Sequence, residues 1–446
     1  MRVKESLFQR PAPVHDAAVM NASTPNRGRR FKARASMAGV GDRLLAPFTG
    51  LLHRLLDRID QGLEAGMIDT TLPDGTRRML GGRAEGPVAI VEIVSWRALA
   101  RLAMGGSAGW YIAWSLGEWR SPDPVPLFDL FMRNRIALGE AARATGLMRL
   151  VRRAWHRLRS NHRKGARRNI EYHYDLGNDF YSLWLDPGMT YSSALFAEPI
   201  SPEESLESAQ HRKLQAMLDR SGTRPGDTIL EIGCGWGSFA EIAAEQGRKV
   251  HGVTLSKEQK AAVEARMARD GLGGVTVSLT DYRDVTGEYD AIVSIEMVEA
   301  VGQEYWPDYL ATIARTLKPG GRAAIQLISI DDAIFETYAS NVDFIQRFVF
   351  PGGLLISEKR FRAIAEAKGL TWRDPVRFGQ HYAETLLRWR ERFDAAVAEG
   401  QLPPEFDRHF IDLWRYYLMY CEGGFRGGGI DVVQVTLIKD EGVRGE

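Results

Sequence analysis

The second half of the chain alternates between two hydrophobic periods. From Thr228 onward, short runs rich in β-branched residues are separated by stretches with helical spacing that end in glycine. The expected strands are 228–232, 249–255, 274–279, 289–297 and 322–330, and the expected helices are 238–247, 257–271 and 308–321. Such alternation predicts parallel strands joined by crossover helices, an α/β sheet that binds its ligand at the carboxyl ends of the strands.

The first half of the chain follows a different pattern. Residues 1–45 lack periodicity and are rich in Arg, Ala, Pro, Asn and Ser, which predicts a disordered basic extension. Apolar residues recur at helical spacing over 48–59, and PVAIVEIVS at 87–95 reads as a strand. A helical pattern interrupted by glycines follows at 98–119. We therefore expect a small α+β domain over 46–148.

The alternation stops after Ile330. The stretch that follows contains DDAIFETYASNVDFIQRFVFPGGLLIS before strand-like and helix-like segments resume. Long interruptions of this kind in compact domains usually serve a function. We expect a lid or substrate-binding insertion over about 331–380, within a domain that runs from 171 to 446.

Composition excludes several classes of protein. The 446 residues include 58 Lys and Arg against 57 Asp and Glu, with 44% hydrophobic residues, which is typical of soluble globular chains. Only Cys234 and Cys421 are present, so neither a disulfide framework nor a cysteine-based zinc site is expected, and we predict no metal. A secretory signal and an apolar run of about 18 residues are also absent from the sequence. A cytoplasmic protein with peripheral membrane contact at most is therefore expected.

Charge is distributed unevenly despite the net value of +1. No acidic residue lies between Glu140 and Glu171, and the interval is rich in Lys and Arg. Its basic residues include Arg149, Arg152, Arg153, Arg157, Arg159, Arg163, Lys164, Arg167 and Arg168. This basic linker, 149–170, is either a solvated helix or a contact for an anionic partner, a lipid surface or nucleic acid.

The sharpest local motif is EIGCGWG at 231–237, between an expected strand and an expected helix. Glycines allow the backbone to turn tightly and approach a ligand, and a helix N-terminus adds a positive dipole end. Ser238 stands at the third glycine position of a dinucleotide fingerprint, and no Gly-Lys-Ser/Thr of a P-loop follows. S-adenosylmethionine is the nucleotide-like ligand that this pattern favours.

A collinear set of motifs extends this interpretation. The set comprises HYDLGNDFY at 173–181, YSS at 191–193, GVTLSKEQ at 252–259, DYRD at 281–284, EMVEAVG at 296–302, FVFPGG at 348–353, HYAETLLRW at 381–389 and YYLMYCEGGFR at 416–426. Together these segments resemble the cyclopropane fatty acid synthase family from about 171 to 440. The resemblance implies a Rossmann-like class I methyltransferase sheet with a lid insertion, beside the small N-terminal α+β domain.

The resemblance also implies an activity and a cofactor site. The enzyme would use S-adenosylmethionine to add a one-carbon unit to the double bond of an unsaturated phospholipid acyl chain. The implied cofactor-binding residues, with Glu231 added because its carboxylate can orient an amino group, are Tyr191, Ser192, Glu231, Gly233, Gly235, Gly237, Thr254, Leu255, Ser256, Gln259, Tyr282 and Arg283. Gln259 offers both a hydrogen-bond donor and an acceptor.

Ring closure requires a base, which in this family is thought to be bicarbonate. The positions that would hold it are Ser193, Glu299, Gln326, Ile328 and Tyr382. Ser193 and Gln326 depart from the Cys and His that the family usually carries there. Gln offers hydrogen bonds but no titration near neutral pH. A cyclopropane ring is the expected product, and a mid-chain methylene or methyl branch is the alternative.

Other candidate residues have two interpretations. Cys421 lies in an aromatic segment and matches a family cysteine once regarded as catalytic, although a buried free Cys is more often a small hydrophobe. Phe344, Phe348 and Phe350 suit either an acyl tunnel or a simple core.

The whole sequence predicts a membrane-peripheral enzyme at the inner membrane face. The expected partner is a bilayer surface of anionic lipids, to which each nearby Lys or Arg adds on the order of 1 kcal/mol. A nucleic-acid methyltransferase is a second hypothesis, disfavoured because the chain lacks an Asn/Asp-Pro-Pro-Tyr/Phe motif; no nucleic-acid partner is expected. A catalytically decayed lipid-binding protein is a third. Monomer and homodimer both remain open.

Overall fold

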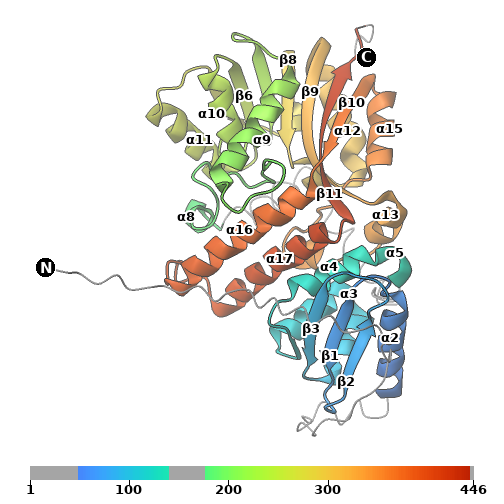
Figure 1. The fold of residues 1–446 in the computed structure, drawn as a ribbon. Coiled ribbons are helices and arrows are strands. Elements are labelled where there is room, and N and C mark those ends of the chain that lie inside the picture. The colour runs from blue at the N-terminus through green and yellow to red at the C-terminus, as the bar shows by residue number, and fades with distance from the viewer. Residues whose placement is uncertain (1–48, 140–175, 442–446) are drawn as a thin grey trace, which may run out of the picture.

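The computed structural model describes residues 49–139 and 176–441, which form two sheets with their helices. In Figure 1 the N-terminal domain, in blue and teal, lies at the opposite end of the molecule from the larger sheet, and helices α16 and α17 run between them. The basic extension 1–45, the basic linker 149–170, and His173 with Asp175 of the first family motif lie outside the described residues.

The N-terminal domain is a four-stranded sheet in the order β2-β1-β3-β4. Buried and exposed residues alternate along its strands because successive side chains point to opposite faces. The β1–β2 hairpin turns between Leu72 and Gly75, where the Gly75 amide donates to the Leu72 carbonyl at 2.8 Å. Its elements are α2 (Thr49–Gly62), β1 (Met67–Thr71), β2 (Arg77–Gly81), β3 (Val88–Ile93), α3 (Trp96–Ser115), β4 (Trp119–Arg120), α4 (Val125–Arg133) and α5 (Arg135–Leu138).

The larger sheet has seven strands in the order β10-β11-β9-β8-β5-β6-β7. Strands β9, β8, β5, β6 and β7 run parallel to one another, and β11 runs antiparallel between β9 and β10. The strands are β5 (Thr228–Ile232), β6 (Lys249–Thr254), β7 (Val275–Leu279), β8 (Tyr289–Ile295), β9 (Leu317–Ile330), β10 (Leu370–Arg377) and β11 (Ile430–Lys439). This arrangement agrees with the class I methyltransferase sheet that the family resemblance implies.

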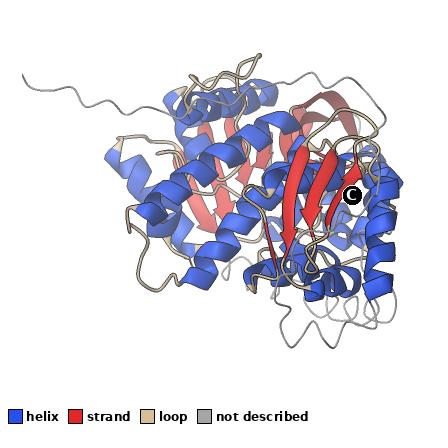
Figure 2. Ribbon diagram, turned by 60° about the horizontal axis from the view of Figure 1, so that its bottom comes forward, coloured by secondary structure: helices blue, strands red, loops and turns tan. Residues whose placement is uncertain are grey.

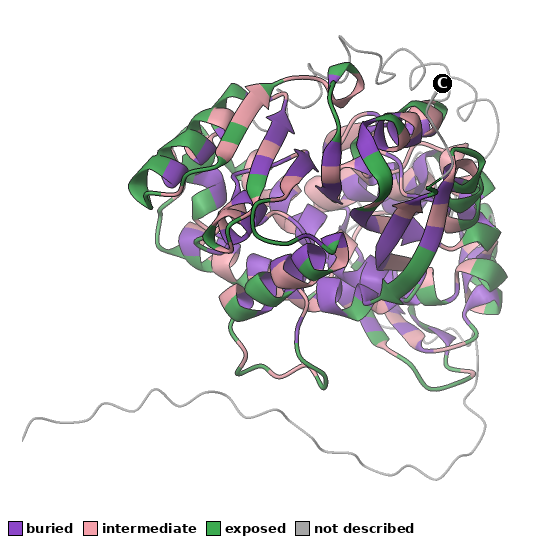
Figure 3. Cartoon of the chain, turned by 90° about the horizontal axis from the view of Figure 1, so that it is seen from above, coloured by how far each residue is buried: buried purple, intermediate pink, exposed green. Residues whose placement is uncertain are grey.

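Helices cover both faces of this sheet (Figures 2 and 3). Ile229 packs with α9 and α10, whereas the next residue, Leu230, joins the cluster formed with α12 and α15. Consecutive residues of β5 therefore bury against different helices, which explains the continuous hydrophobic run of this strand. These helices are α9 (Leu206–Ser221), α10 (Ser238–Glu245), α11 (Lys257–Arg269), α12 (Trp306–Thr316) and α15 (Glu358–Ala367), with the short α8 (Asn178–Ser182) preceding them.

Two long helices connect the halves of the molecule, α16 (Gly379–Ala398) and α17 (Arg408–Arg426). Helix α17 packs closely on α4: a Cβ added at Gly423 would lie 2.5 Å from the Cβ of Phe128, and one at Gly427 would lie 2.7 Å from the Asp129 carbonyl oxygen. The Arg135 guanidinium also pairs with Asp331 beyond strand β9. The N-terminal domain is therefore an integral wall of the molecule and shares one hydrophobic core with α16 and α17.

Two boundaries differ from those predicted. The insertion expected over about 331–380 contains α13 (Asp332–Ala339) and α14 (Phe344–Phe348), but α15 and β10 rejoin the larger sheet, so it spans only 331–357. The helix expected over 308–321 ends at Thr316, because Leu317 already pairs with Tyr289 as the start of β9. Within the described residues, no helix is long and apolar enough to cross a membrane.

Candidate active site

The glycine loop follows β5 and leads into α10. Gly233, Gly235 and Gly237 have φ values of +81°, +51° and +88°, a region that L side chains rarely adopt. The amides of Gly233 and Cys234 donate to the Val253 carbonyl at 3.0 and 3.2 Å, which fixes the loop against β6. The loop thus opens over the carboxyl ends of two adjacent strands.

The next two strand ends add polar side chains to this opening. After β6, Thr254 Oγ1 donates to Gln259 Oε1 at 2.7 Å, and Ser256 caps α11. After β7, Asp281 holds the Arg283 guanidinium by two hydrogen bonds of 2.8 and 2.6 Å. The same guanidinium lies 5.5 Å from the centre of the Tyr282 ring, within cation–π range.

These segments surround a cavity of about 180 Å³, the cofactor cavity. All but two of the residues predicted to bind the cofactor line it: Tyr191, Ser192, Glu231, Gly233, Gly235, Thr254, Leu255, Gln259, Tyr282 and Arg283. Gly237 and Ser256 stand behind the wall, where each is the N-cap of a helix, α10 and α11 respectively. The sequence therefore brings the predicted set together, with two members in supporting positions.

Buried charge distinguishes the floor of the cofactor cavity. Burial raises the pKa of the Glu231 carboxyl well above its usual range, and Lys213 opposes that rise. Glu231 Oε2 is buried without a hydrogen-bond partner among the described residues. An unpartnered carboxylate oxygen beside a glycine loop fits the amino-acid part of S-adenosylmethionine, whose ammonium group would satisfy it.

Lys213 is a component that the sequence reasoning missed. It lies on α9, is fully buried, and its Nζ donates to Ser192 Oγ at 2.6 Å. Burial lowers the pKa of Lys213 to about 8, although Glu296, Asp186 and Glu231 all favour its charged form. Its spacing is a signal, because Lys213 lies four residues after Ala209 and four before Met217, on the buried face of α9.

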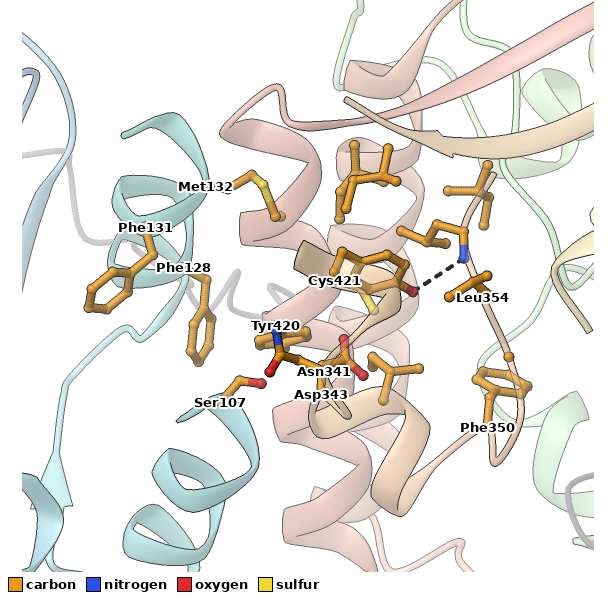
Figure 4. A pocket seen from close by; sticks show the side chains of 18 of the residues that line it. Ser107, Phe128, Phe131, Met132, Asn341, Asp343, Phe350, Leu354, Tyr420 and Cys421 are labelled. Carbon is orange, nitrogen blue, oxygen red and sulfur yellow. Dashed lines mark hydrogen bonds between the residues drawn. The ribbon is translucent and has the colours of Figure 1, made fainter. Parts of the chain in front are cut away.

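A larger cavity of about 410 Å³, the apolar cavity, lies beside the cofactor cavity. Figure 4 shows its walls: Phe128 and Met132 come from α4, Phe350 and Leu354 come from the insertion, and Cys421 of α17 lies between them. The N-terminal domain thus supplies one side of this cavity. Of the three phenylalanines proposed for a tunnel, only Phe350 lines it, whereas Phe344 and Phe348 pack against Tyr111.

The two cavities share three lining residues, Tyr191, Glu296 and Ala300. Tyr191 Oη lies 3.0 Å from Tyr417 Oη, which places the ring at the boundary. Glu296 follows β8 and is the second group that the sequence reasoning missed. The signal was present, because Glu296 and Glu299 stand three residues apart in the motif EMVEAVG after a buried strand.

Four of the five residues predicted to hold an anion surround the carboxyl groups of Glu296 and Glu299, and the fifth is Glu299 itself. Ser193 N and Gln326 Nε2 donate to Glu296 Oε1 at 2.9 and 2.8 Å, and Ile328 N donates to Glu299 Oε1 at 2.5 Å. The hydroxyl of Ser193 turns away and donates to the neighbouring Ala194 carbonyl at 3.0 Å. The predicted set is therefore assembled around side chains of the protein itself.

Tyr382 and Cys421 complete the predicted catalytic set. The Tyr382 hydroxyl hydrogen bonds to Glu296, and burial raises the pKa of this phenol well above its usual range. Burial likewise raises the pKa of the Cys421 thiol. A thiol held protonated is a poor nucleophile, so the environment of Cys421 fits a wall of the apolar cavity.

Known proteins resemble this arrangement along most of the chain. A family model described as mycolic acid cyclopropane synthetase matches residues 161–435. The tuberculostearic acid methyltransferase of Mycobacterium tuberculosis is 37% identical over 415 residues, which cover 89% of this chain and 93% of that protein. The cyclopropane-fatty-acyl-phospholipid synthase of Escherichia coli is 38% identical over 267 residues, or 59% of this chain and 66% of that protein.

Solved structures resemble the methyltransferase part. A mycolic acid cyclopropane synthase complexed with SAH and CTAB has a TM-score of 0.57 and 32% identity, over 61% of this chain and 98% of that chain. A cyclopropane synthase from Mycobacterium tuberculosis has a TM-score of 0.56 and 31% identity over the same shares. The chain belongs to the mycolic acid cyclopropane synthetase family and is an S-adenosylmethionine-dependent lipid methyltransferase.

Proposed function

We propose that this enzyme adds a one-carbon unit to the double bond of an unsaturated acyl chain in a phospholipid. The observation that carries the proposal is the junction of the two cavities at Tyr191, Glu296 and Ala300. S-adenosylmethionine supplies an electrophilic methyl group when bound in the cofactor cavity. An acyl chain in the apolar cavity would present its double bond at that junction, so the reacting carbons would meet where the cavities join.

The apolar cavity suits an acyl chain because its apolar walls exclude water. Burying each methylene group contributes roughly 0.8 kcal/mol, so a chain threaded through such a cavity gains binding energy without a polar anchor. The aromatic wall that Tyr191 and Tyr417 form at the boundary can also stabilise a carbocation through the ring quadrupole. Exclusion of water protects such a cation from attack.

A cyclopropane ring is the proposed product, and a mid-chain methylene or methyl branch is the second candidate. The second candidate is supported by the relative that matches 89% of this chain, which is named a tuberculostearic acid methyltransferase. The relative named a cyclopropane-fatty-acyl-phospholipid synthase matches 59% of it. Both products begin with the same methyl transfer and differ in the fate of the cation.

We further propose that the enzyme docks on the anionic inner membrane face through its N-terminal domain and basic linker. Within the described residues, all but two of the exposed large hydrophobic side chains belong to this domain. They are Leu51, Met79, Val88, Ile90, Met104, Leu116 and Ile136. Co-sedimentation with vesicles should weaken as salt rises or as anionic lipid is replaced by neutral lipid, and binding that ignores both changes would contradict docking on anionic lipid.

Substrate class is tested with methyl-labelled S-adenosylmethionine and vesicles of matched chain length. Unsaturated phospholipid should acquire label in the acyl chains, recovered as fatty acid methyl esters, and saturated phospholipid should acquire none. Label in the head group, or equal labelling of both lipids, would refute the proposal.

A further inference from the structure

Glu296 has a backbone conformation that its residue type disfavours. Its φ is +49°, in the left-handed region, which costs a residue with a side chain about 1–2 kcal/mol. Such strain persists where the surroundings hold it, and it concentrates at functional sites. The conformation places the Glu296 side chain, fully buried, at the junction of the two cavities.

The surroundings of this carboxylate are built to receive an anion. Gln434 Nε2 donates to Gln326 Oε1 at 3.0 Å, so the amide of Gln326 must direct its NH₂ group at Glu296. The backbone amide of Ser193 and the Tyr382 hydroxyl add two further donors. Three hydrogen bonds thus converge on one side chain in a water-poor site, an arrangement that favours a charged acceptor.

The donors implied to hold a bicarbonate ion are already engaged by carboxyl groups of the protein. The five residues implied to hold that ion are Ser193, Glu299, Gln326, Ile328 and Tyr382, and four of them already contact Glu296 or Glu299 through hydrogen bonds while the fifth is Glu299 itself. A further anion would lie against two buried carboxyl groups, where like charges disfavour one another. The residues present do not fit the ion.

We propose that the Glu296 carboxylate occupies the anion site and acts as the general base of the reaction, in place of a soluble ion. The inference rests on the proposed function. It goes further because it assigns the role of proton acceptor to a carboxylate of the protein itself. The side chain lines both cavities, which is where a transferred methyl group would lie.

The step balances without another reactant. The alkene electron pair forms a bond to the methyl carbon while the sulfur–methyl bond breaks and leaves its pair on sulfur, so a cation develops on the adjacent carbon. Glu296 then takes a proton from the transferred methyl, and the C–H electron pair closes the ring. If a hydride shifts first, the same proton removal forms an exocyclic methylene. Glu296 ends the cycle protonated and returns the proton to water.

The neighbours of Glu296 oppose the effect of burial on its pKa. Burial raises the pKa of Glu296, whereas Gln326, Ser193, Lys213 and Tyr382 lower it. Burial and the adjacent Glu296 together raise the pKa of Glu299 to about 8. The donors converge on Glu296, so they favour the charged form at Glu296 and leave the protonated form to Glu299. A base whose pKa is brought toward the working pH is an efficient one.

The test compares Glu296→Gln with Glu296→Gly. Glutamine keeps the shape and removes the base, so turnover should fall by about a hundredfold or more while the Kd for S-adenosylmethionine changes by less than about threefold. Glycine accepts the left-handed φ and empties the anion site, so added formate or bicarbonate should restore part of its turnover. The unmodified enzyme should turn over equally in carbonate-free and bicarbonate-supplemented buffer. Loss of its activity on carbonate removal, or a Glu296→Gln variant within about tenfold of it, would overturn the proposal.

Formate calorimetry separates this inference from the proposed function. Formate should release heat on binding to Glu296→Gly and none on binding to the unmodified enzyme, whatever the lipid substrate. Heat with both proteins would show an open anion site and overturn the assignment. An enzyme that binds S-adenosylmethionine yet labels no unsaturated lipid would instead refute the proposed function, and the calorimetry would still decide what occupies the site.

Discussion

Replacing either of two glycines of the same loop by alanine should impair a different property. Gly235→Ala should weaken cofactor binding, and Gly237→Ala should lower thermal stability. Gly235 has a φ of +51°, lines the cofactor cavity, and has no atom within 4 Å of a Cβ added there. Gly237 has a φ of +88°, lies behind the cavity wall, and its Cβ would meet Val263 Cγ1 at 2.9 Å and Cγ2 at 3.0 Å. The two substitutions are therefore matched in chemistry and differ in what the new methyl touches.

The size of each effect follows from these contacts. A left-handed alanine costs about 1–2 kcal/mol at either position. Val263 is fully buried and stiff, so Gly237→Ala adds overpacking of about 1–3 kcal/mol. For a domain of this size, each kcal/mol corresponds to roughly 2–4 °C in Tm. Gly235→Ala instead projects its methyl into the cofactor cavity, where loss of about 1.4 kcal/mol of binding weakens affinity tenfold.

Thermal unfolding and calorimetric titration with S-adenosylmethionine measure both quantities. We expect Gly237→Ala to have the lower Tm and Gly235→Ala the higher Kd, by about tenfold or more. Normal affinity in Gly235→Ala would refute the placement of the cofactor over the loop. A Tm for Gly237→Ala no lower than that of Gly235→Ala would refute the packing argument.

Three further predictions concern the buried charges and the cavity wall. The folded-state pKa of Glu299 is raised to about 8, so its protonated form stabilises the fold fully below the unfolded value of 4.5, and this stabilisation is lost as pH rises through 8. The Tm of Glu299→Gln should therefore rise relative to that of the unmodified enzyme between pH 5 and pH 8.5. A constant Tm difference would contradict the raised pKa. Lys213→Met removes the cation that lowers the pKa of Glu296 and leaves Glu299 and Tyr382 unchanged. The acid limb of the pH profile of turnover should therefore move up by about one pH unit. An unmoved limb would show that Lys213 does not set the pKa of Glu296. Met132→Trp should fill the apolar cavity and lower turnover by about tenfold with S-adenosylmethionine affinity intact. Val376→Trp, at an exposed position of β10 outside both cavities and outside the proposed docking surface, should change neither. Equal turnover in both variants would exclude the N-terminal wall from substrate binding.

The sequence predicts the larger sheet and the cofactor loop because both depend on local signals. β-Branched runs, glycines that end helices and the EIGCGWG turn each occupy a few adjacent residues, and the structure places them as expected. Strand β10 falls inside the insertion predicted over about 331–380; its last five residues are exposed, so they lack the alternation of apolar and polar residues that would mark a strand. The antiparallel strand β11 that holds it lies 53 residues further along the chain, from Arg377 to Ile430.

The site differs from the prediction where long-range geometry decides the role of a side chain. The resemblance names Ser193, Gln326 and Tyr382, and the structure brings all three to one acceptor, which the resemblance does not name. That acceptor is Glu296, brought to them by a left-handed turn after β8. The apolar cavity could not be predicted from local sequence either, because its walls α4 and α17 lie far apart in the chain and meet only when it folds.

The central claim is that a methyl group passes to an acyl double bond and then loses a proton to a base of the protein. The most direct measurement supplies S-adenosylmethionine with a fully deuterated methyl group, together with unsaturated phospholipid vesicles in carbonate-free buffer, and reads the acyl chains by mass spectrometry and NMR. The account predicts acyl chains that retain two of the three deuterons, in a ring or in a methylene branch. Three deuterons retained in a methyl branch, or product formed only when bicarbonate is added, would contradict it.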